Sequence, residues 1–240
     1  MNEDKIYIDE KLGEEPFRFD DAVAQVFPDM LRRSIPGYTA TLEAIGSLAA
    51  RHVAAGTNCY DLGCSLGAAT LAMRRGIRAD GCRIIAVDSS EAMIERCKTV
   101  VAGAADVEVR LADILDVEIE NASMVVMNYT LQFLTIDTRE SMLERIFRGL
   151  LPGGLLLLSE KVVDEDPRME ELLVDLHHEH KRRNAYSELE ISRKRTALEN
   201  VLIPETVTAH KRRLANAGFA HAAVWLRFFN FVSIVAIKQS

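Results

Sequence analysis

The sequence is short of the features that mark secreted and membrane proteins. Only four of its 240 residues are cysteine, and no two of them form a C-x-x-C pair, so a disulfide framework is not expected. No apolar run approaches the about 20 residues that span a bilayer, and the first residues lack the basic start and apolar segment of a signal peptide. We therefore expect a cytoplasmic protein with reduced cysteines.

Basic residues are also outnumbered. The formal net charge is -7 at pH 7, from 29 lysines and arginines against 36 acidic residues. Affinity for nucleic acids comes mainly from basic side chains that neutralise phosphates, so this balance argues against a general nucleic-acid coat and favours small ligands. The 48% apolar content is enough for one sizeable core, and we expect a single domain spanning residues 1–240.

Short apolar runs alternate along the chain with amphipathic stretches. This alternation is typical of a parallel sheet covered by helices. Proline and glycine punctuate it and end the third of the expected helices. The expected strands lie near 57–62, 83–88, 107–111, 122–128 and 154–160, and the expected helices near 67–76, 90–102 and 138–150, the last ended by Pro152-Gly153-Gly154.

The C-terminal part of the chain departs from this alternation. Two β-prone runs, 223–228 and 231–237, are separated only by Phe229-Asn230, and so short a connection permits only an antiparallel pair. The pattern predicts an α/β protein with the Rossmann-like class I methyltransferase fold, a mostly parallel seven-stranded sheet with an antiparallel C-terminal hairpin. An N-terminal helical cap at 1–54 and a helical insertion at 166–217 lie outside that core. Long connections usually carry function, so either could cover the ligand site.

A glycine-punctuated turn follows the first predicted strand, in the run Tyr60-Asp61-Leu62-Gly63-Cys64-Ser65-Leu66-Gly67. Together with a second strand that ends in Asp88, it describes half of a nucleotide-binding α/β domain. The run also fits the hydrolase pattern G-x-S-x-G with Ser65 as nucleophile, but that elbow normally follows several strands, whereas 1–54 looks helical. A plain strand-to-helix turn without a ligand is a further alternative.

The middle position of this turn discriminates between ligands. A dinucleotide site needs glycine there so that the backbone can approach the pyrophosphate, and Ser65 places a Cβ atom instead. S-adenosylmethionine has no phosphate; it needs close backbone contact and an acid near its amino group, which Asp61 would supply. The turn therefore favours S-adenosylmethionine over a dinucleotide.

Polar side chains end the later strands at the same edge of the sheet. Asp88 could accept hydrogen bonds from both ribose hydroxyls, although it could also cap the helix that begins after Ser89. Asp113 and Ile114 follow the third strand and offer an acceptor for the adenine amino group and an apolar edge for the ring. Asn128 closes the fourth strand after an apolar run, which places it at the mouth of the same cleft.

Five segments carry a more specific likeness, and they include parts of both inserted regions. They are Val26-Phe27-Pro28-Asp29-Met30, Ser34-Ile35-Pro36-Gly37-Tyr38, Tyr60-Asp61-Leu62-Gly63-Cys64-Ser65-Leu66-Gly67-Ala68-Ala69-Thr70, Tyr186-Ser187-Glu188-Leu189-Glu190-Ile191-Ser192 and Leu198-Glu199-Asn200-Val201. In these segments the chain resembles the carboxy-S-adenosyl-L-methionine synthase family. Generic methyltransferases do not share both insertions, so this likeness is more specific than the glycine turn.

The resemblance implies a bacterial enzyme that transfers no methyl group. Members of the family take the carboxyl group of prephenate, release phenylpyruvate and place the carboxyl on the sulfonium methyl of S-adenosylmethionine. The product serves a partner enzyme, a tRNA carboxymethyltransferase that modifies a wobble uridine. The resemblance also implies a homodimer and no catalytic metal, and direct nucleic-acid binding is not required. It places the ligand contacts at Tyr38, Gly63, Cys64, Ser65, Asp88, Ser89, Asp113, Ile114, Asn128 and Arg195.

The carboxylate of such a product needs a cation, and arginine with its fork of donors is the natural partner. Ser187-x-x-Glu190 predicts a capping box that opens a helix, in which Ile191, Leu198 and Leu202 share one face.

Helical periodicity singles out one arginine in this segment. At about 100° per residue Arg195 falls on the apolar face, whereas Arg193 points away and Lys194 lies at the margin. The resemblance places the carboxylate-binding, catalytic arginine at Arg195 as well. An arginine stem that only covers apolar surface is the alternative.

The run His177-His178-Glu179-His180 suggests a metal site, but its spacing matches no recognised ligand pattern. Packing histidines are commoner, and we expect no metal. The residues expected to share a buried face with His177 and His180 are Met169, Leu172, Leu173 and Leu176.

Basic clusters at 181–183, 193–195 and 211–213 are expected to be solvated helix surface, with contacts to RNA or across a dimer as alternatives. Two functional alternatives also stay open. One is a conventional S-adenosylmethionine-dependent methyltransferase acting on a small molecule or RNA. The other is a non-catalytic S-adenosylmethionine-binding partner of a tRNA-modifying enzyme.

Overall fold

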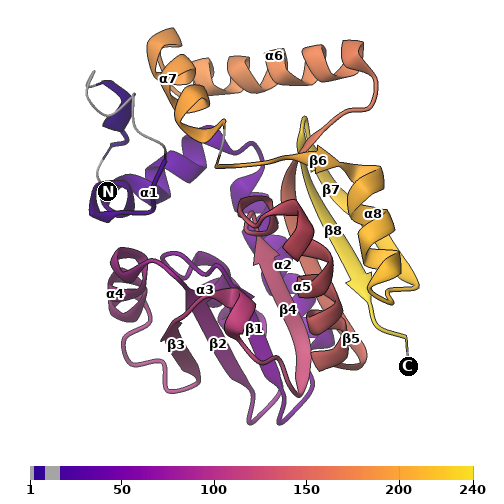
Figure 1. Ribbon diagram of the computed structural model, residues 1–240. Coiled ribbons are helices and arrows are strands. Elements are labelled where there is room, and N and C mark those ends of the chain that lie inside the picture. Colours follow the sequence, from indigo (N-terminus) through magenta and orange to yellow (C-terminus); the bar gives the residue numbers. More distant parts are fainter. Residues whose placement is uncertain (1–2, 9–16, 200, 240) are drawn as a thin grey trace.

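The computed structural model of the chain describes residues 3–8, 17–199 and 201–239. Part of the predicted N-terminal cap, together with Asn200, lies outside the described residues. Within them, helices cover both faces of one sheet, and a further pair of helices crosses the edge at which the parallel strands end (Figure 1).

The sheet has the strand order β3-β2-β1-β4-β5-β8-β7, and a short β6 pairs with β5. Strands β1 to β5 run parallel, and β8 is antiparallel to both β5 and β7. The predicted α/β fold, with its antiparallel C-terminal hairpin, is confirmed. The strands are β1 (Asn58–Leu62), β2 (Arg83–Asp88), β3 (Val107–Leu111), β4 (Ala122–Asn128), β5 (Leu150–Val163), β6 (Glu205–Thr206), β7 (His221–Phe228) and β8 (Phe231–Ile237).

Two strands differ from their predictions. β5 begins at Leu150, directly after a helix, and continues through Pro152-Gly153-Gly154, which the sequence predicts as a break. The break is bridged because Gly153 donates a backbone hydrogen bond to Lys238 and Gly154 accepts one from it. β6 lies inside the insertion that the sequence predicts as helical, and its two residues are too few to show a periodicity.

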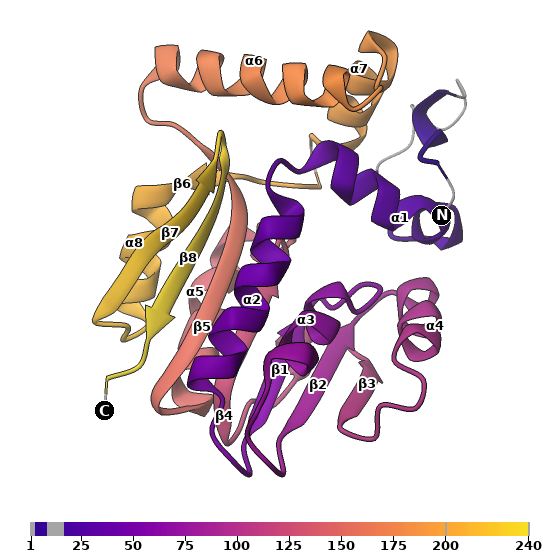
Figure 2. The ribbon, with the colours of Figure 1, turned by 180° about the vertical axis from the view of Figure 1, so that it is seen from behind.

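The helices form layers on the two faces of the sheet (Figures 1 and 2). α2 and α3 pack on one face, where Ile45 and Met73 are fully buried, and α5 and α8 pack on the other. No helix in the described ranges is long and apolar enough to cross a membrane. The helices are α1 (Asp21–Ser34), α2 (Tyr38–His52), α3 (Ala68–Gly76), α4 (Glu91–Val100), α5 (Ile136–Gly149), α6 (Pro167–Arg183), α7 (Glu188–Leu198) and α8 (Val207–Asn216), with 3-10 turns η1 (Ile6–Ile8), η3 (Ile114–Asp116) and η4 (Leu131–Phe133).

α6 and α7 lie over the carboxyl edge of the parallel strands beside α1, and we call this pair the lid (Figures 1 and 2). Buried polar contacts join the lid to the N-terminal segment. Lys194 Nζ donates to Ser34 Oγ at 2.8 Å, the Tyr186 hydroxyl donates to Asp4, and the Arg33 guanidinium lies 4.1 Å from the centre of the Tyr186 ring. Contacts between residues of the first third of the chain and residues of the last third therefore hold the lid in place.

The contact between α2 and α3 depends on two glycines. A Cβ atom at Gly76 would lie 2.0 Å from the carbonyl oxygen of Gly46, so Gly76→Ala would force the two helices apart. We expect a loss of about 3 kcal/mol of unfolding free energy, and a correspondingly lower Tm in a thermal melt. The control, Ser47→Ala on the exposed side of α2, should stay within about 0.5 kcal/mol of wild type. An unchanged Tm for Gly76→Ala would contradict the close packing.

Candidate functional site

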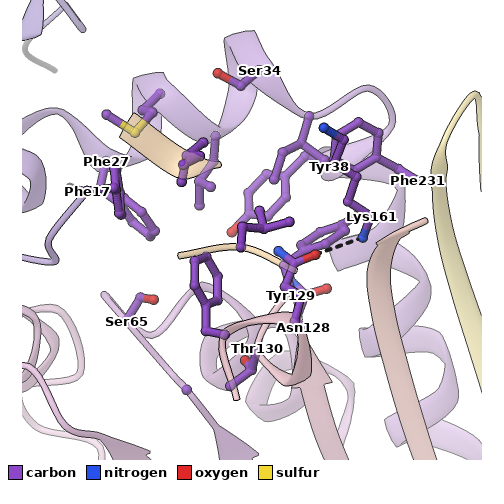
Figure 3. A pocket seen from close by; sticks show the side chains of 18 of the residues that line it. Phe17, Phe27, Ser34, Tyr38, Ser65, Asn128, Tyr129, Thr130, Lys161 and Phe231 are labelled. Carbon is purple, nitrogen blue, oxygen red and sulfur yellow. Dashed lines mark hydrogen bonds between the residues drawn. The ribbon is translucent and has the colours of Figure 1, made fainter. Parts of the chain in front are cut away.

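A cavity of about 830 Å³ lies between the carboxyl ends of the parallel strands and the lid (Figure 3). Side chains from the strand ends form its floor, α1 and α2 form one side, and the lid closes it from above. Asp61 and the ten residues at which the resemblance places ligand contacts all line this one cavity. The ten are Tyr38, Gly63, Cys64, Ser65, Asp88, Ser89, Asp113, Ile114, Asn128 and Arg195.

The glycine turn forms part of the floor and lies tightly against neighbouring strands. The backbone N–H groups of Gly63 and Cys64 both donate to the Val87 carbonyl, at 2.8 and 2.9 Å. Gly63 has φ +80°, and a Cβ atom there would lie 2.4 Å from the Thr130 side chain. Ser65 adopts φ +48°. Its hydroxyl has no histidine partner in the described residues, so the structure offers no base for a hydrolase elbow.

Asp61 is buried beneath this turn. Its Oδ2 accepts a hydrogen bond from Thr70 Oγ1 at 2.6 Å, but its Oδ1 has no partner among the described residues. Burial raises the pKa of Asp61 to about 6, and the nearby Asp88 adds to the rise. Asn128 Oδ1 is likewise buried without a partner in the described residues. Because buried oxygens without donors are costly, these two atoms fit a ligand that brings N–H groups.

Hydrogen bonds from the backbone fix both carboxylate oxygens of Asp88. Oδ2 accepts from the Ser65 backbone N–H and Oδ1 from the Ser90 backbone N–H, each at 2.9 Å. Burial nevertheless raises the pKa of Asp88 above its ordinary value. The residue that caps α4 is Ser90, so the alternative that Asp88 is the helix cap is wrong. The carboxylate keeps lone pairs for a second set of donors, such as two vicinal hydroxyls.

The third strand ends in a polar and apolar pair at the rim. Asp113 is exposed and accepts the Leu115 backbone N–H at 2.8 Å, which caps the η3 turn. Ile114 is buried within the same turn and still faces the cavity. The pair offers an acceptor beside an apolar edge, which suits a heteroaromatic ring with an exocyclic amine.

Aromatic side chains form the wall below the lid. Tyr38, at the start of α2, lies with its ring centre 6.4 Å from that of Tyr129, which is 6.0 Å from that of Phe231 (Figure 3). The sequence prediction omits Tyr129 and Phe231. Tyr129 could have been found, since it directly follows Asn128 at a strand end; Phe231 reaches the cavity only because β8 pairs with β5.

The helix that carries Arg195 begins as predicted, because Ser187 and Glu190 form the capping box. The buried face of this helix differs from the one that the sequence predicts. α7 ends at Leu198, so Leu202 is not on the helix, and Arg195 is an exposed residue that borders the cavity rather than part of a buried face. Arg195 thus lines the ligand space and remains exposed to solvent.

Lys194 is the buried cation of α7, not a marginal residue. It is 4% exposed, and its ammonium lies 3.6 Å from Asp4. Burial lowers its pKa to about 8 against the opposing effect of Asp4. Arg193 is half-buried and donates to the Tyr7 carbonyl at 3.1 Å, so it does not simply point away. Both differences arise because α7 packs on the N-terminal segment.

The histidine run packs against the wall of the cavity. His177 Nε2 lies 2.9 Å from the Ser34 carbonyl oxygen, and its ring is 4.8 Å from that of Phe231. Burial lowers the pKa of His177 to about 2, so the ring is neutral. No group of three or more potential metal ligands comes together in the described residues. Met169 and Leu172 are 45% and 49% exposed, so their predicted burial is wrong; α6 projects past the sheet at that end (Figure 1).

Curated proteins match this chain over nearly its full length. The carboxy-S-adenosyl-L-methionine synthase of Aliivibrio fischeri (strain MJ11) is 55% identical over 232 residues, covering 95% of both chains. The protein of the same name from Vibrio atlanticus (strain LGP32) is 57% identical with the same coverage.

Broader comparisons agree on the fold. The family model described as a methyltransferase domain matches residues 60–154. Human N-acetylserotonin methyltransferase in complex with SAM matches with a TM-score of 0.64 at 20% identity, over 98% of this chain and 58% of that one. A putative S-adenosyl-L-methionine-dependent methyltransferase from Methanococcus maripaludis gives 0.62 at 20% identity, over 95% and 97%. The fold is that of class I methyltransferases, and by its full-length relatives the chain belongs to the carboxy-S-adenosyl-L-methionine synthase family.

Proposed function

We propose that this enzyme converts S-adenosyl-L-methionine and prephenate to carboxy-S-adenosyl-L-methionine and phenylpyruvate. Family membership supports the product. The observation that carries the proposal for this chain is the distribution of charge in the cavity, with carboxylates at the floor and, on the lid side, more cations than the two acids Glu170 and Glu199. A sulfonium amino acid matches the floor, and a carboxylate added to its methyl group matches the lid.

The floor fits S-adenosylmethionine group by group. The unpartnered Asp61 Oδ1 and Asn128 Oδ1 suit the ammonium of the methionine part, and Asp88 suits the ribose hydroxyls. Asp113 and Ile114 suit the adenine. The absence of a Cβ atom at Gly63 lets the Thr130 side chain pack directly against the turn.

The proposed reaction balances without an added oxidant or reductant. Prephenate loses its ring carboxyl as carbon dioxide and its ring hydroxyl as hydroxide, which leaves the aromatic ring of phenylpyruvate. The sulfonium methyl loses a proton, and that proton and the hydroxide form water. The electron pair left on the methyl carbon forms the new bond to carbon dioxide. Arg195 would then hold the carboxylate that forms.

We further propose a cytoplasmic homodimer whose product passes to a tRNA carboxymethyltransferase. The identity to named synthases supports this role, and the four free cysteines fit a reducing compartment. The proposal requires no nucleic acid to enter the cavity and no metal.

The direct test is incubation with S-adenosylmethionine and prephenate, followed by mass measurement of both products. We expect phenylpyruvate and a sulfonium product heavier than S-adenosylmethionine by one carboxyl group in place of a hydrogen. Methyl transfer to an added acceptor, with no carboxylated product, would favour a conventional methyltransferase. Binding without turnover would favour a non-catalytic partner.

Asp61→Asn tests the acid at the floor. The pKa of Asp61 is about 6 in the unliganded protein, so the carboxyl is neutral below that pH and cannot pair with an ammonium. We expect the Kd for S-adenosylmethionine to rise by about tenfold per pH unit below pH 6 in wild type. The Asn variant should bind about tenfold or more weakly at pH 7.5 and show a flatter profile. A calorimetric pH series makes the measurement, and an unchanged Kd in the variant would contradict the assignment.

Arg195→Ala tests the cation at the lid. We expect the fold to be intact and carboxy-S-adenosyl-L-methionine to bind about tenfold or more weakly, because a charged hydrogen bond contributes about 1.5–3 kcal/mol. The Kd for S-adenosylmethionine should change by less than about threefold. Arg212→Ala, an exposed position on α8, is the control. Equal weakening of both ligands would show that Arg195 does not contact the new carboxylate.

A further inference from the structure

Two lysines on the lid side of the cavity stand out because neither is paired with an acid in the described chain. Lys161 lies near the end of β5 and Lys181 near the end of α6, and both line the cavity. Lys181 is only 7% exposed. Among the described residues, neither ammonium forms a hydrogen bond or an ion pair. Lys194 differs from both, because its ammonium donates a hydrogen bond to Ser34 and forms an ion pair with Asp4.

The surroundings of the two lysines are predominantly positive. Burial, Lys194 and Lys161 together lower the pKa of Lys181 to about 7. Burial also lowers the pKa of Lys161, and Arg195 contributes to that lowering. The neighbouring carboxyl of Glu160 is buried, and burial raises its pKa to about 8, which favours its neutral form at neutral pH.

The carboxylates that border this part of the cavity do not pair with the lysines. Glu170 lowers the positive potential at Lys161, but its Oε2 accepts the Asp164 backbone N–H at 2.7 Å. Glu199 lines the cavity and is exposed. Across the described part of the chain, no ion pair joins either acid to Lys161 or Lys181.

Buried ammonium groups without counterions are costly, and proteins that keep them use them for a ligand or for chemistry. A single carboxylate on the sulfonium methyl needs one cation, and Arg195 is available for it. The two lysines therefore supply positive charge beyond what that product needs. This excess of positive charge fits a second anionic ligand beside the sulfonium compound.

The aromatic wall beside Lys161 indicates the structure of the uncharged part of that anion. Lys161 and Phe231 are direct partners across the antiparallel pair of β5 and β8, so their side chains share one face (Figure 3). Tyr129 packs against the same Phe231 ring. A molecule with a flat apolar ring and acidic groups would place the ring on these aromatics and its charges on the lysines.

We infer that Lys161 and Lys181 bind the carboxylates of the carboxyl donor, a cyclic dicarboxylate, and hold it against Phe231 above the sulfonium. The inference rests on the proposed function for the identity of the donor, prephenate. It assigns the second substrate to the side of the cavity formed by β5 and α6. The floor formed by the glycine turn is left to S-adenosylmethionine.

The test separates donor binding from turnover. S-adenosylhomocysteine lacks the reactive methyl, so calorimetry with prephenate on the protein saturated with it measures binding alone. Lys161→Met and Lys181→Met keep most of the length of the side chain and remove its charge. We expect each substitution to raise the Kd for prephenate by about tenfold or more, while the Kd for S-adenosylhomocysteine changes by less than about threefold.

Two controls distinguish a binding role from a structural one. Lys211→Met, at an exposed position of α8, should leave both affinities unchanged. Lys181→Arg should retain most of the affinity for prephenate, because it keeps the charge. The Tm of the unliganded Met variants should stay level or rise, since an unpaired buried charge is removed.

The outcomes distinguish this inference from the proposed function. Wild-type affinity for prephenate in both Met variants would overturn the inference, even if wild type makes the carboxylated product. Parallel losses of Tm and of S-adenosylhomocysteine affinity would also overturn it, as a sign of structural lysines. Prephenate binding that depends on the lysines, without turnover by wild type, would support the site and refute the proposed reaction.

Discussion

The cost of keeping unpaired charge away from water is the constraint on which this cavity depends. At its floor, Asp61 has one buried oxygen without a partner in the described residues and a pKa raised to about 6. On the lid side, Lys181 is buried without a counterion in the described residues, and its pKa falls to about 7. The two ends carry opposite sign, so the cavity needs a cationic group at its floor and anionic groups on the lid side. S-adenosylmethionine and an anionic carboxyl donor together meet that demand.

The fold creates this polarity from distant parts of the chain. Parallel strands end at one edge, which gathers Asp61, Asp88 and Asn128 at the floor. The cations come from β5 and the lid, and the lid is fixed through Lys194 and Tyr186 to Ser34 and Asp4. Because the N-terminal segment holds the lid, the upper half of the site depends on contacts outside the methyltransferase core.

The floor of the site could be predicted from the sequence, because it follows from local patterns. Apolar runs locate the strands, and Asp88 and Asn128 stand directly at strand ends. The lid could not be predicted as well. Periodicity indicates that Arg195 shares the apolar face of α7, yet Lys194 is buried, because Asp4 and Ser34 fix the rotation of that helix. Lys161 could not be predicted as a site residue, because in the sequence it only follows an apolar run. The pairing of β5 with β8 places its side chain beside Phe231.

The central claim is that the two ends of one ligand satisfy opposite charges in this cavity. A crystal structure of the protein with carboxy-S-adenosyl-L-methionine tests it most directly. The account predicts the ammonium within hydrogen-bonding distance of Asp61 or Asn128, and the added carboxylate within that distance of Arg195. A carboxylate turned to bulk solvent, or an ammonium lying beneath α6 and α7, would contradict it.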